Sequence, residues 1–329
     1  MTGGAGYIGS HTVRHLLAAD HEVVVLDDLS AGHRAALPAG IALVEASTGD
    51  RAAVDATLRQ YQPDAVIHFA GSIEAGESMA DPRRFYANNV TNALSLLDAV
   101  VESVGKRAAI PVVFSSSAAV YGEPDHVPIS EEAPRRPTNV YGDTKLVFEQ
   151  ALAAYGRAYD VRSVSLRYFN ACGAAADGSI GADHRHKTHL VTIALLAALG
   201  QRPAVEVMGT DYATPDGTCI RDYVHVDDLA SAHVLALQAL ADGAPTTAYN
   251  VGVGEGFSVG QVLDATDRVV GRPVPRRLGP RRPGDPARLV ADSTKIRRQL
   301  GWSPQYTGLD EMIATAWRWH SSHPHGYPD

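Results

Sequence analysis

Hydrophobic and polar residues follow two alternating patterns along the first half of the chain. Short, continuous runs rich in Val, Ile and Leu predict strands that are buried on both faces, as in a parallel sheet. These runs cover residues 21–27, 41–45, 64–70, 110–115 and 161–168, and a shorter one begins at 224–226. Between them, apolar residues recur every three or four positions, which predicts helices over residues 9–19, 52–60, 83–104 and 140–159.

The alternation of strands and helices predicts an α/β fold: a doubly wound, Rossmann-type parallel sheet that binds its ligand at the carboxyl ends of the strands. After Asn170 the pattern loosens into loops, a predicted helix at 188–199 and an Arg- and Pro-rich stretch at 272–288. We therefore expect a nucleotide-binding domain over residues 1–170 and a smaller C-terminal substrate-binding lobe over residues 171–329. The chain is expected to return to the first lobe around residues 216–240.

Composition narrows the classes of function. Of the 329 residues, 45% are hydrophobic, and the net charge of −8 argues against a nucleic-acid binder, which needs surplus Lys and Arg. The sequence has only two cysteines and no signal-peptide pattern, so we expect a cytoplasmic protein. The longest apolar runs, such as 193–199, are too short to span a bilayer, and no membrane partner is expected.

Glycines at positions 3, 6 and 9 stand directly before the first predicted helix. Gly3 permits a tight turn, Gly6 lets the backbone approach a pyrophosphate, and Gly9 allows close packing of the helix. A diphosphate is favoured there because the helix N-terminus presents free N–H groups and a positive dipole. Asp27 ends the next strand, at the spacing expected of the acid that binds the adenosine ribose. Asp27 and Asp28 would both repel a 2′-phosphate, which favours NAD over NADP.

This glycine pattern normally follows a strand, yet only Met1 and Thr2 precede Gly3. The first strand of the sheet is thus expected to be missing here or to lie upstream. If it is absent from the protein, we expect lower stability and weaker cofactor binding.

Tyr141 and Lys145 lie four residues apart in a predicted helix and so share one face. A nearby ammonium favours a phenolate, and we expect Lys145 to lower the Tyr141 pKa. Upstream, Ser115, Ser116 and Ser117 close a core strand, where a hydroxyl can face the ligand. A tyrosine so placed serves as general base for a hydroxyl while hydride leaves the same carbon.

Together these motifs resemble the extended short-chain dehydrogenase/reductase superfamily and, within it, the UDP-glucose 4-epimerase family. The similar stretches are GGAGYIGSHT (3–12), HFAG (68–71), FSSSAAVYG (114–122), LRYFNACGA (166–174), GTDYATPDGTCIRDYVHVDDL (209–229) and RRPGDPARLVAD (281–292). They are spread over essentially the whole chain, and the run at 210–226 is the most specific of them.

The resemblance implies roles for individual residues. Tyr141 would be the base, Ser117 would bind the 4-oxygen, and Lys145 would bind the nicotinamide ribose. The remaining cofactor contacts would come from Gly3, Gly6, Tyr7, Ile8, Gly9, Asp27, Asp28, Asp50, Arg51, Phe69, Ala70, Gly71, Asn89 and Tyr168. The UDP part of the substrate would be bound by Asn170, His189, Leu190, Met208, Arg221, Arg282 and Asp285, with the two arginines on the diphosphate.

The implied reaction is an NAD-dependent inversion at C4 that interconverts UDP-glucose and UDP-galactose through a transient 4-keto sugar. Two departures from the family pattern bear on it. Ile73 stands where relatives often carry a lysine, which removes a cofactor contact. Leu289 stands where some relatives place a tyrosine against the sugar, which leaves UDP-N-acetylglucosamine and other UDP-sugars open as substrates.

Three other functions are weighed against epimerisation. A 4,6-dehydratase needs an acid and a base beside the catalytic Ser or Thr, and this chain has Ala118 and Ala119 there. A net ketoreductase stays open, although the match to the UDP site speaks against it. A catalytically impaired NAD-binding protein would result if the first strand were missing, but the presence of Tyr141 and Lys145 argues for catalysis.

Two further expectations concern metal ions and assembly. The histidines near 184–189, at 11 and 15 and at 320–325 are expected on a solvated loop, a helix face and the tail, with no metal site. The resemblance implies a homodimer through helices 83–104 and 140–159. Ala93, Leu94, Leu97 and Val101 form an apolar stripe on the first of these helices, although core packing would explain the stripe equally well.

Overall fold

A parallel sheet forms the centre of the computed structural model, which describes residues 1–103, 109–282 and 285–328. Strands β2 and β1 pair with each other, and the remaining strands follow in the order β3-β4-β5-β9. The strands are β1 (Val24–Asp27), β2 (Ala42–Glu45), β3 (Val66–His68), β4 (Val112–Ser115), β5 (Ser163–Tyr168) and β9 (Thr247–Val251).

The two groups of strands are joined by Thr2. This residue makes parallel bridges to Leu26 in β1 and to His68 in β3. The Thr2 N–H donates to the Ile67 carbonyl at 3.0 Å, and the Phe69 N–H donates to the Thr2 carbonyl at 3.0 Å. One bridging residue therefore occupies the central position at which the sequence shows no complete strand.

The structure confirms five of the predicted strand runs and corrects the sixth. Residues 224–226 belong mostly to β8 (Ile220–His225), which lies in a separate, smaller sheet. The last strand of the main sheet is β9 instead, and the sequence analysis missed it. Its run is interrupted by the fully buried Asn250, whose amide donates to the Ile129 carbonyl and whose oxygen accepts from Tyr121.

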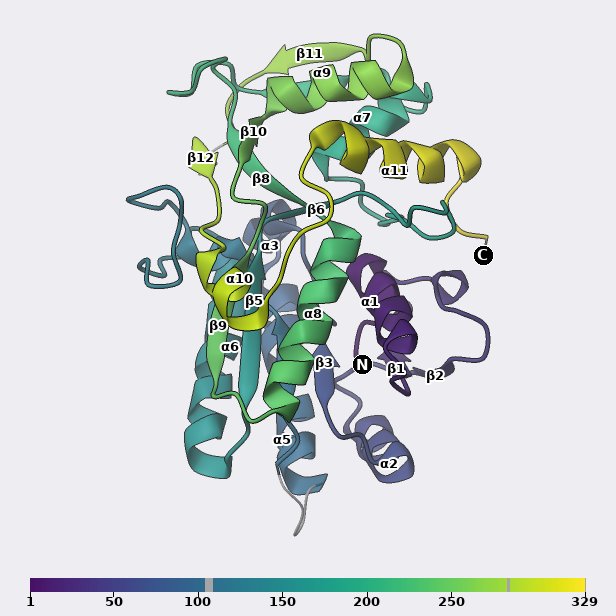
Figure 1. Cartoon of the computed structure of the whole chain (residues 1–329), viewed down its shortest axis with the longest axis vertical. Helices are drawn as coiled ribbons and strands as arrows, with labels where there is room; N and C mark the ends of the chain where they lie inside the picture. Colours follow the sequence, from purple (N-terminus) through teal and green to yellow (C-terminus); the bar gives the residue numbers. More distant parts are fainter. Residues whose placement is uncertain (104–108, 283–284, 329) are drawn as a thin grey trace.

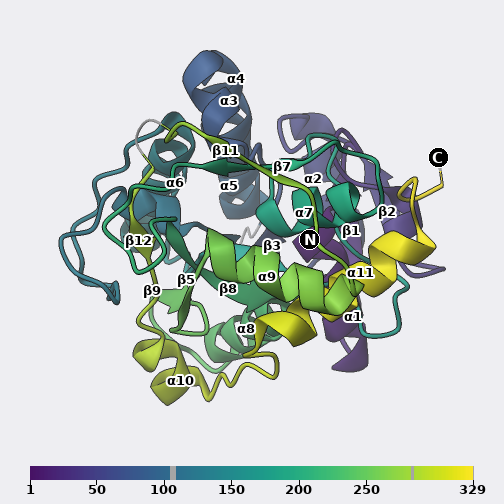
Figure 2. The ribbon, with the colours of Figure 1, turned by 90° about the horizontal axis from the view of Figure 1, so that it is seen from above.

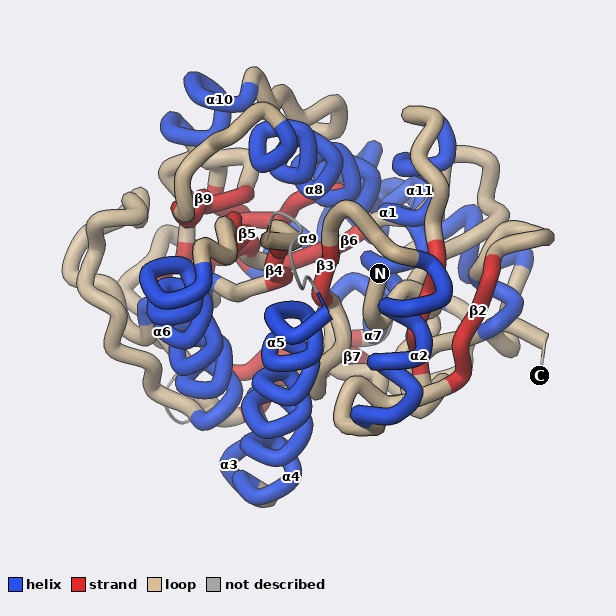
Figure 3. The backbone as a smooth tube through the Cα atoms, turned by 90° about the horizontal axis from the view of Figure 1, so that it is seen from below, coloured by secondary structure: helices blue, strands red, loops and turns tan. Residues whose placement is uncertain are grey.

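Helices cover both faces of the main sheet (Figures 1 and 3). Alternate residues of each strand face opposite sides, so Val112 and Phe114 join one core cluster and Val113 joins the other. One face is covered by α1 (Tyr7–Ala18) and α8 (Val226–Ala241), and the other by α2 (Arg51–Tyr61), α5 (Asn92–Ser103) and α6 (Val140–Tyr159). Shorter elements are η1 (Arg34–Ala36), α3 (Ala75–Ala80), η3 (Ala118–Tyr121) and α10 (Thr294–Leu300).

The helix predicted over 83–104 is not continuous. It consists of α4 (Pro82–Tyr86), a π-helical turn η2 (Ala87–Thr91) and α5, while residue 104 lies outside the described residues. The oxygen of the buried Asn89 carboxamide accepts from the Ser72 N–H, and its nitrogen donates to the Ser72 carbonyl and to the Thr144 hydroxyl. π-Helical turns occur often at functional sites, and this one turns a cofactor-site candidate toward α6.

A smaller lobe stands over the carboxyl ends of the main strands (Figures 1 and 2). Its strands are β6 (Asn170–Cys172), β7 (Val205–Met208), β8, β10 (Gly256–Ser258), β11 (Arg276–Gly279) and β12 (Arg288–Leu289). Its helices are α7 (Leu190–Ala198), α9 (Val259–Val270) and α11 (Leu309–Ser322). Between these elements the chain returns to the main sheet as α8 and β9, and the domain boundaries at 170 and 171 stay predictions.

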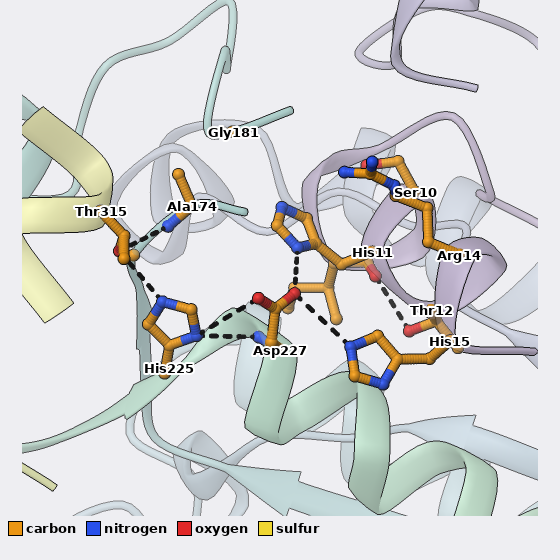
Figure 4. Close-up of polar contacts among 12 residues, drawn as sticks. Ser10, His11, Thr12, Arg14, His15, Ala174, Gly181, His225, Asp227 and Thr315 are labelled. Atoms are coloured by element: carbon orange, nitrogen blue, oxygen red, sulfur yellow. Dashed lines mark hydrogen bonds and ion pairs between the residues drawn. The ribbon is translucent and has the colours of Figure 1, made fainter. Parts of the chain in front are cut away.

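A polar cluster fastens α1 to α8 (Figure 4). His11 Nδ1 lies 2.6 Å from Asp227 Oδ1, and His225 connects the same region to Thr315 of α11 at 3.0 Å. Burial raises the Asp227 pKa, but hydrogen bonds from His11 and His15 outweigh it and hold that pKa well below its usual value. His11 is 1% exposed, so the expectation of a solvated helix face is wrong for this residue.

Asp222 of β8 fastens the smaller lobe to the loop after β9. Its fully buried carboxylate accepts from the backbone N–H groups of Val253 at 2.9 Å, Gly254 at 3.0 Å and Ala291 at 3.1 Å. Burial raises the Asp222 pKa to about 6, although the three donors act in the opposite direction.

None of the helices in the described parts of the chain is long and apolar enough to cross a membrane.

We predict that Asp222→Ala lowers the free energy of unfolding by about 3–5 kcal/mol, because it leaves three buried N–H groups without an acceptor. Urea denaturation measures the loss. Asp264→Ala is the control, since it removes an exposed carboxylate 3.0 Å from Arg276 and should cost at most about 1 kcal/mol. Equal losses in the two variants would contradict the role given to Asp222.

Candidate active site

The glycine turn at the start of α1 is shaped by close backbone contacts. Gly3 has a φ of +69°, and a Cβ there would lie 2.5 Å from the Ala70 nitrogen. A Cβ on Gly9 would lie 2.2 Å from the Gly3 carbonyl oxygen, so no larger residue fits without moving the turn. The N-cap residue Gly6 offers no side-chain cap, which leaves the first N–H groups of α1 available to a ligand. These features fit the pyrophosphate of a dinucleotide.

Asp27 lies beside this turn at the carboxyl end of β1. It is 8% exposed, and its carboxylate accepts from the Ala5 N–H at 2.9 Å and from the Leu29 N–H at 2.9 Å. Burial raises the Asp27 pKa, whereas these two hydrogen bonds lower it. Because an ionised carboxylate offers about four lone-pair sites, both oxygens can still accept from a ribose diol. Asp28 instead accepts from Ser30 on the surface.

Other predicted cofactor residues have different surroundings. Asp50 caps α2 by accepting from the Ala53 N–H at 3.1 Å, and Arg51 pairs with Asp55 and Glu102. The structure thus places these two side chains in contacts of their own helix and of α5.

The residues after β3 lie closer to the predicted catalytic group. Phe69 packs on the His233 ring, and a Cβ on Gly71 would come within 3.1 Å of Asn89 and 3.8 Å of the Lys145 ammonium. Near the other end of the site, Tyr7 donates to the Gly173 carbonyl at 2.6 Å, and Tyr168 pairs with the Ser115 hydroxyl. Ile8 packs against the core beneath the turn.

Ser117, Tyr141 and Lys145 are brought together by β4 and α6. Ser117 follows the end of β4, and Asn139 caps α6 by accepting from the Gly142 N–H at 2.8 Å. The Lys145 ammonium donates to the Ser115 carbonyl at 2.8 Å and lies 5.8 Å from the centre of the Tyr141 ring. All three side chains are at least nine-tenths buried, which excludes bulk water from the reacting groups.

Burial controls the protonation of this trio. It raises the Tyr141 pKa, although a hydrogen bond with Ser117 lowers it. It also lowers the Lys145 pKa to about 8, against the attraction of Glu149. The expectation that Lys145 lowers the Tyr141 pKa is therefore wrong for the protein alone, because burial raises this pKa and the Lys145 ammonium binds a carbonyl instead. A cationic nicotinamide would add the positive charge that a phenolate needs.

The predicted substrate residues form two groups in the smaller lobe. Arg221 is 9% exposed, donates to the Ile220 carbonyl at 2.7 Å and pairs with Asp285. The Asp285 N–H donates to the carbonyl of Arg282, whose side chain is exposed. Met208 ends β7 beside this region. The second group, Asn170, His189 and Leu190, lines a cavity that Tyr7 also lines.

Sequence reasoning missed several buried polar residues. His184 stacks on His189 with ring centres 4.6 Å apart, and burial lowers the His184 pKa to about 3. His184 is half-buried with its Nδ1 shielded from solvent, and His320 is 6% exposed, so neither side chain is fully solvated as expected. Within residues 1–103, 109–282 and 285–328, no cluster of His, Cys, Asp and Glu is placed to hold a metal ion.

Glu149 and Arg167 are the other omission. They form a buried ion pair behind the catalytic trio, with Arg167 Nη2 2.6 Å from Glu149 Oε2. Two signals in the sequence could have identified them. Glu149 lies one helical turn after Lys145, and Arg167 is a charged residue inside an otherwise buried strand run.

The parallel sheet, the glycine turn with Asp27, and the buried Tyr141–Lys145 pair define a dinucleotide-dependent enzyme of Rossmann type. The sequence model of the NAD dependent epimerase/dehydratase family matches residues 1–252. The chain belongs to this family.

Relatives and solved structures agree with this assignment over the full length. The chain is 46% identical to the UDP-glucose 4-epimerase of Lacticaseibacillus casei, over 100% of this chain and 98% of that protein. A crystal structure of UDP-glucose 4-epimerase superposes with a TM-score of 0.96 at 45% identity, covering 100% of this chain and 98% of that one. The Brucella ovis UDP-glucose 4-epimerase in complex with NAD gives a TM-score of 0.92 at 46% identity, with 96% of each chain covered.

We predict that Gly9→Ala strips the purified protein of most of its NAD. Its new methyl group would overlap the Gly3 carbonyl and displace the turn, at a cost of about 1–3 kcal/mol, which lowers cofactor affinity tenfold or more. The NAD released on denaturation is measured per chain. Gly76→Ala is the control, because no atom lies within 4 Å of a Cβ there, and wild-type NAD content in Gly9→Ala would contradict the prediction.

Proposed function

We propose that the chain interconverts UDP-glucose and UDP-galactose by inverting the configuration at C4. The observation that carries the proposal is the buried trio of Ser117, Tyr141 and Lys145. Ser117 follows the carboxyl end of β4, and Tyr141 and Lys145 lie in the first two turns of α6. The chemistry of this trio is that of alcohol oxidation, and the full-length similarity to UDP-glucose 4-epimerases points to a UDP-hexose as the alcohol.

NAD, when bound, supplies a hydride acceptor that gives the hydride back within the same turnover. Tyr141 accepts the proton of the 4-hydroxyl and later returns a proton to the same oxygen. Between these two steps the sugar turns and presents the opposite face of C4. Ser117 holds that oxygen by a hydrogen bond, and Lys145 binds the nicotinamide ribose. The sugar passes through a 4-keto form that rotates about its bond to the diphosphate.

The remaining site residues are proposed to hold the two ligands. Gly3, Gly6, Gly9 and Asp27 receive the adenosine diphosphate half of NAD. Arg221 and Arg282 bind the UDP diphosphate, and Asp285 binds the uridine ribose. The existing pair between Arg221 and Asp285 supports this assignment, because it holds both groups in place before UDP arrives. This fixed grip lets the sugar turn while UDP stays bound.

Leu289 favours a second candidate substrate, UDP-N-acetylglucosamine. It packs on a cluster that includes Ala118 and Leu146, beside the catalytic strand. A leucine makes no hydrogen bond to a sugar and leaves more room than a tyrosine would.

We also propose a cytoplasmic location, which the two free, buried cysteines support.

We predict that Tyr141→Phe lowers kcat by about 10²- to 10⁴-fold with little change in KM, because the ring remains and only the base is lost. An assay coupled to UDP-glucose formation from UDP-galactose measures the effect. Tyr159→Phe is the matched control, since Tyr159 lies on the same helix but is 54% exposed. Near wild-type turnover by Tyr141→Phe would contradict the mechanism, and parallel runs with UDP-N-acetylglucosamine decide between the two substrates.

We further propose a homodimer through α5 and α6, which lie side by side (Figure 3) and are joined by a hydrogen bond from Tyr155 to Asp98. Ala93 and Leu97 of the predicted stripe are core residues, whereas Leu94 and Val101 are only partly buried and remain to be covered. Sedimentation equilibrium should give twice the 34.9 kDa of one chain.

Leu94→Glu is expected to produce single chains, because it places a charge in the proposed interface. Leu278→Glu is the control, since Leu278 is 72% exposed on β11 and should leave the mass unchanged. A monomeric wild type would rule out the dimer.

A further inference from the structure

A buried ion pair lies directly behind the catalytic trio. Glu149 of α6 and Arg167 of β5 are 7% and 3% exposed. Arg167 donates to Glu149 twice, from Nε to Oε1 at 2.9 Å and from Nη2 to Oε2 at 2.6 Å. Two parallel hydrogen bonds of this kind fix the orientation of the carboxylate relative to the guanidinium. Arg167 also donates to the Tyr121 hydroxyl at 2.8 Å, which in turn donates to Asn250.

The pair is connected to the end of the catalytic strand. Ser116 Oγ donates to Glu149 Oε1 at 2.6 Å and is fully buried. Its two neighbours belong to the site, since the Ser115 carbonyl accepts from Lys145 and the Ser117 side chain hydrogen-bonds to Tyr141. Glu149 therefore holds the middle of the three serines while the outer two contact the reacting groups.

Glu149 also acts on Lys145 through its charge. The two residues are four positions apart in α6 and lie on one helical face. Burial lowers the Lys145 pKa, and the negative charge of Glu149 acts against this and leaves the pKa at about 8. Without that carboxylate, a fully buried ammonium would lose its proton in the neutral range.

Other charged or titratable groups surround these two residues. His68 of β3 is 2% exposed, and burial together with Lys145 lowers its pKa to about 3, so it stays neutral. Tyr141 and Tyr168 both have raised pKa values through burial and are uncharged at neutral pH. Around Glu149, Arg135 lies 3.9 Å from Oε2 on the exposed side, and the Glu131 carbonyl contacts Arg167. Glu149 is thus the carboxylate that opposes the loss of a proton from Lys145.

We propose that Glu149 and Arg167 are positioning residues for the reaction: Glu149 keeps Lys145 in its ammonium form and fixes the serine strand end, and Arg167 holds the Glu149 carboxylate in place. The proposal rests on the proposed function, because it assigns Lys145 a charge that strengthens its hydrogen bond to the nicotinamide ribose. It extends the active site one layer behind the residues that contact the ligands. Neither residue is among those assigned to the substrate or the cofactor above.

The composition of the chain makes the Lys145 charge directly measurable. The sequence contains four lysines, so protein labelled with ¹³C and ¹⁵N at lysine gives four side-chain signals in an NMR titration. Lys145→Arg identifies the signal of Lys145. In Glu149→Gln, which keeps the shape and removes the charge, the Lys145 titration should move down by about one pH unit or more. Asp228→Asn is the matched control, because it removes a buried carboxylate that accepts from Gln305 and Tyr306 instead.

The double variant Glu149→Gln/Arg167→Met keeps the proposal testable if Glu149→Gln does not fold. It removes both charges and fills the space with an apolar chain, which proteins often tolerate. The Lys145 titration should again move down, but by less than in Glu149→Gln, because loss of the Arg167 cation acts in the opposite direction. An unchanged Lys145 titration in the folded variants would overturn the proposal, and so would an equal shift in Asp228→Asn.

The pH profile of kcat with UDP-galactose connects the charge to the reaction. Since Lys145 must be protonated, the alkaline limb of the kcat profile should move to lower pH in Glu149→Gln, by as much as the NMR titration of Lys145 does. KM should stay within about twofold of the wild-type value. A Lys145 titration that moves without the kcat profile would overturn the positioning role. A wild type that fails to turn over UDP-galactose would overturn the proposed function alone, because the NMR titration still tests whether Glu149 controls Lys145.

Discussion

The pairing of residues 1–3 between β1 and β3 is the contact on which the rest of the structure depends. Thr2 is the residue that bridges the two groups of strands, and the Gly3 N–H donates to the Leu26 carbonyl at 3.0 Å. This pairing places the glycine turn at the carboxyl ends of the strands. α1 can then start directly over the crevice and pack on α8, so the cofactor end and the substrate end of the site share one framework.

Burial dominates the chemistry of the site. Water is excluded from Ser117, Tyr141 and Lys145, which strengthens every electrostatic contact among them but disfavours each charged form. The protein offsets this cost with fixed partners: a carbonyl for Lys145, Ser117 for Tyr141, and Glu149 one helical turn away. The opposing effects leave the Lys145 pKa at about 8, which is close to neutral pH.

Local patterns in the sequence predicted the elements that obey simple periodicity. The helix over 140–159 is observed with the same bounds, because its caps and apolar face agree with its packing. β9 escaped prediction since the buried Asn250 is satisfied by residues far away in the sequence. The break at 87–91 has the same origin, as Asn89 binds the loop at Ser72 and Thr144 of α6. The catalytic trio followed from motif and spacing. Glu149 and Arg167 each left a signal in the sequence, but that they pair with each other follows only from the contact between α6 and β5.

The central claim is that hydride leaves C4 and returns to the same sugar without exchange. Its most direct test uses UDP-galactose carrying deuterium at C4, incubated with the protein as purified and without added NAD. We predict UDP-glucose that retains its deuterium at C4, as seen by NMR and mass spectrometry. Loss of deuterium from C4, or conversion only in the presence of a stoichiometric supply of NAD, would contradict transient oxidation within one closed site.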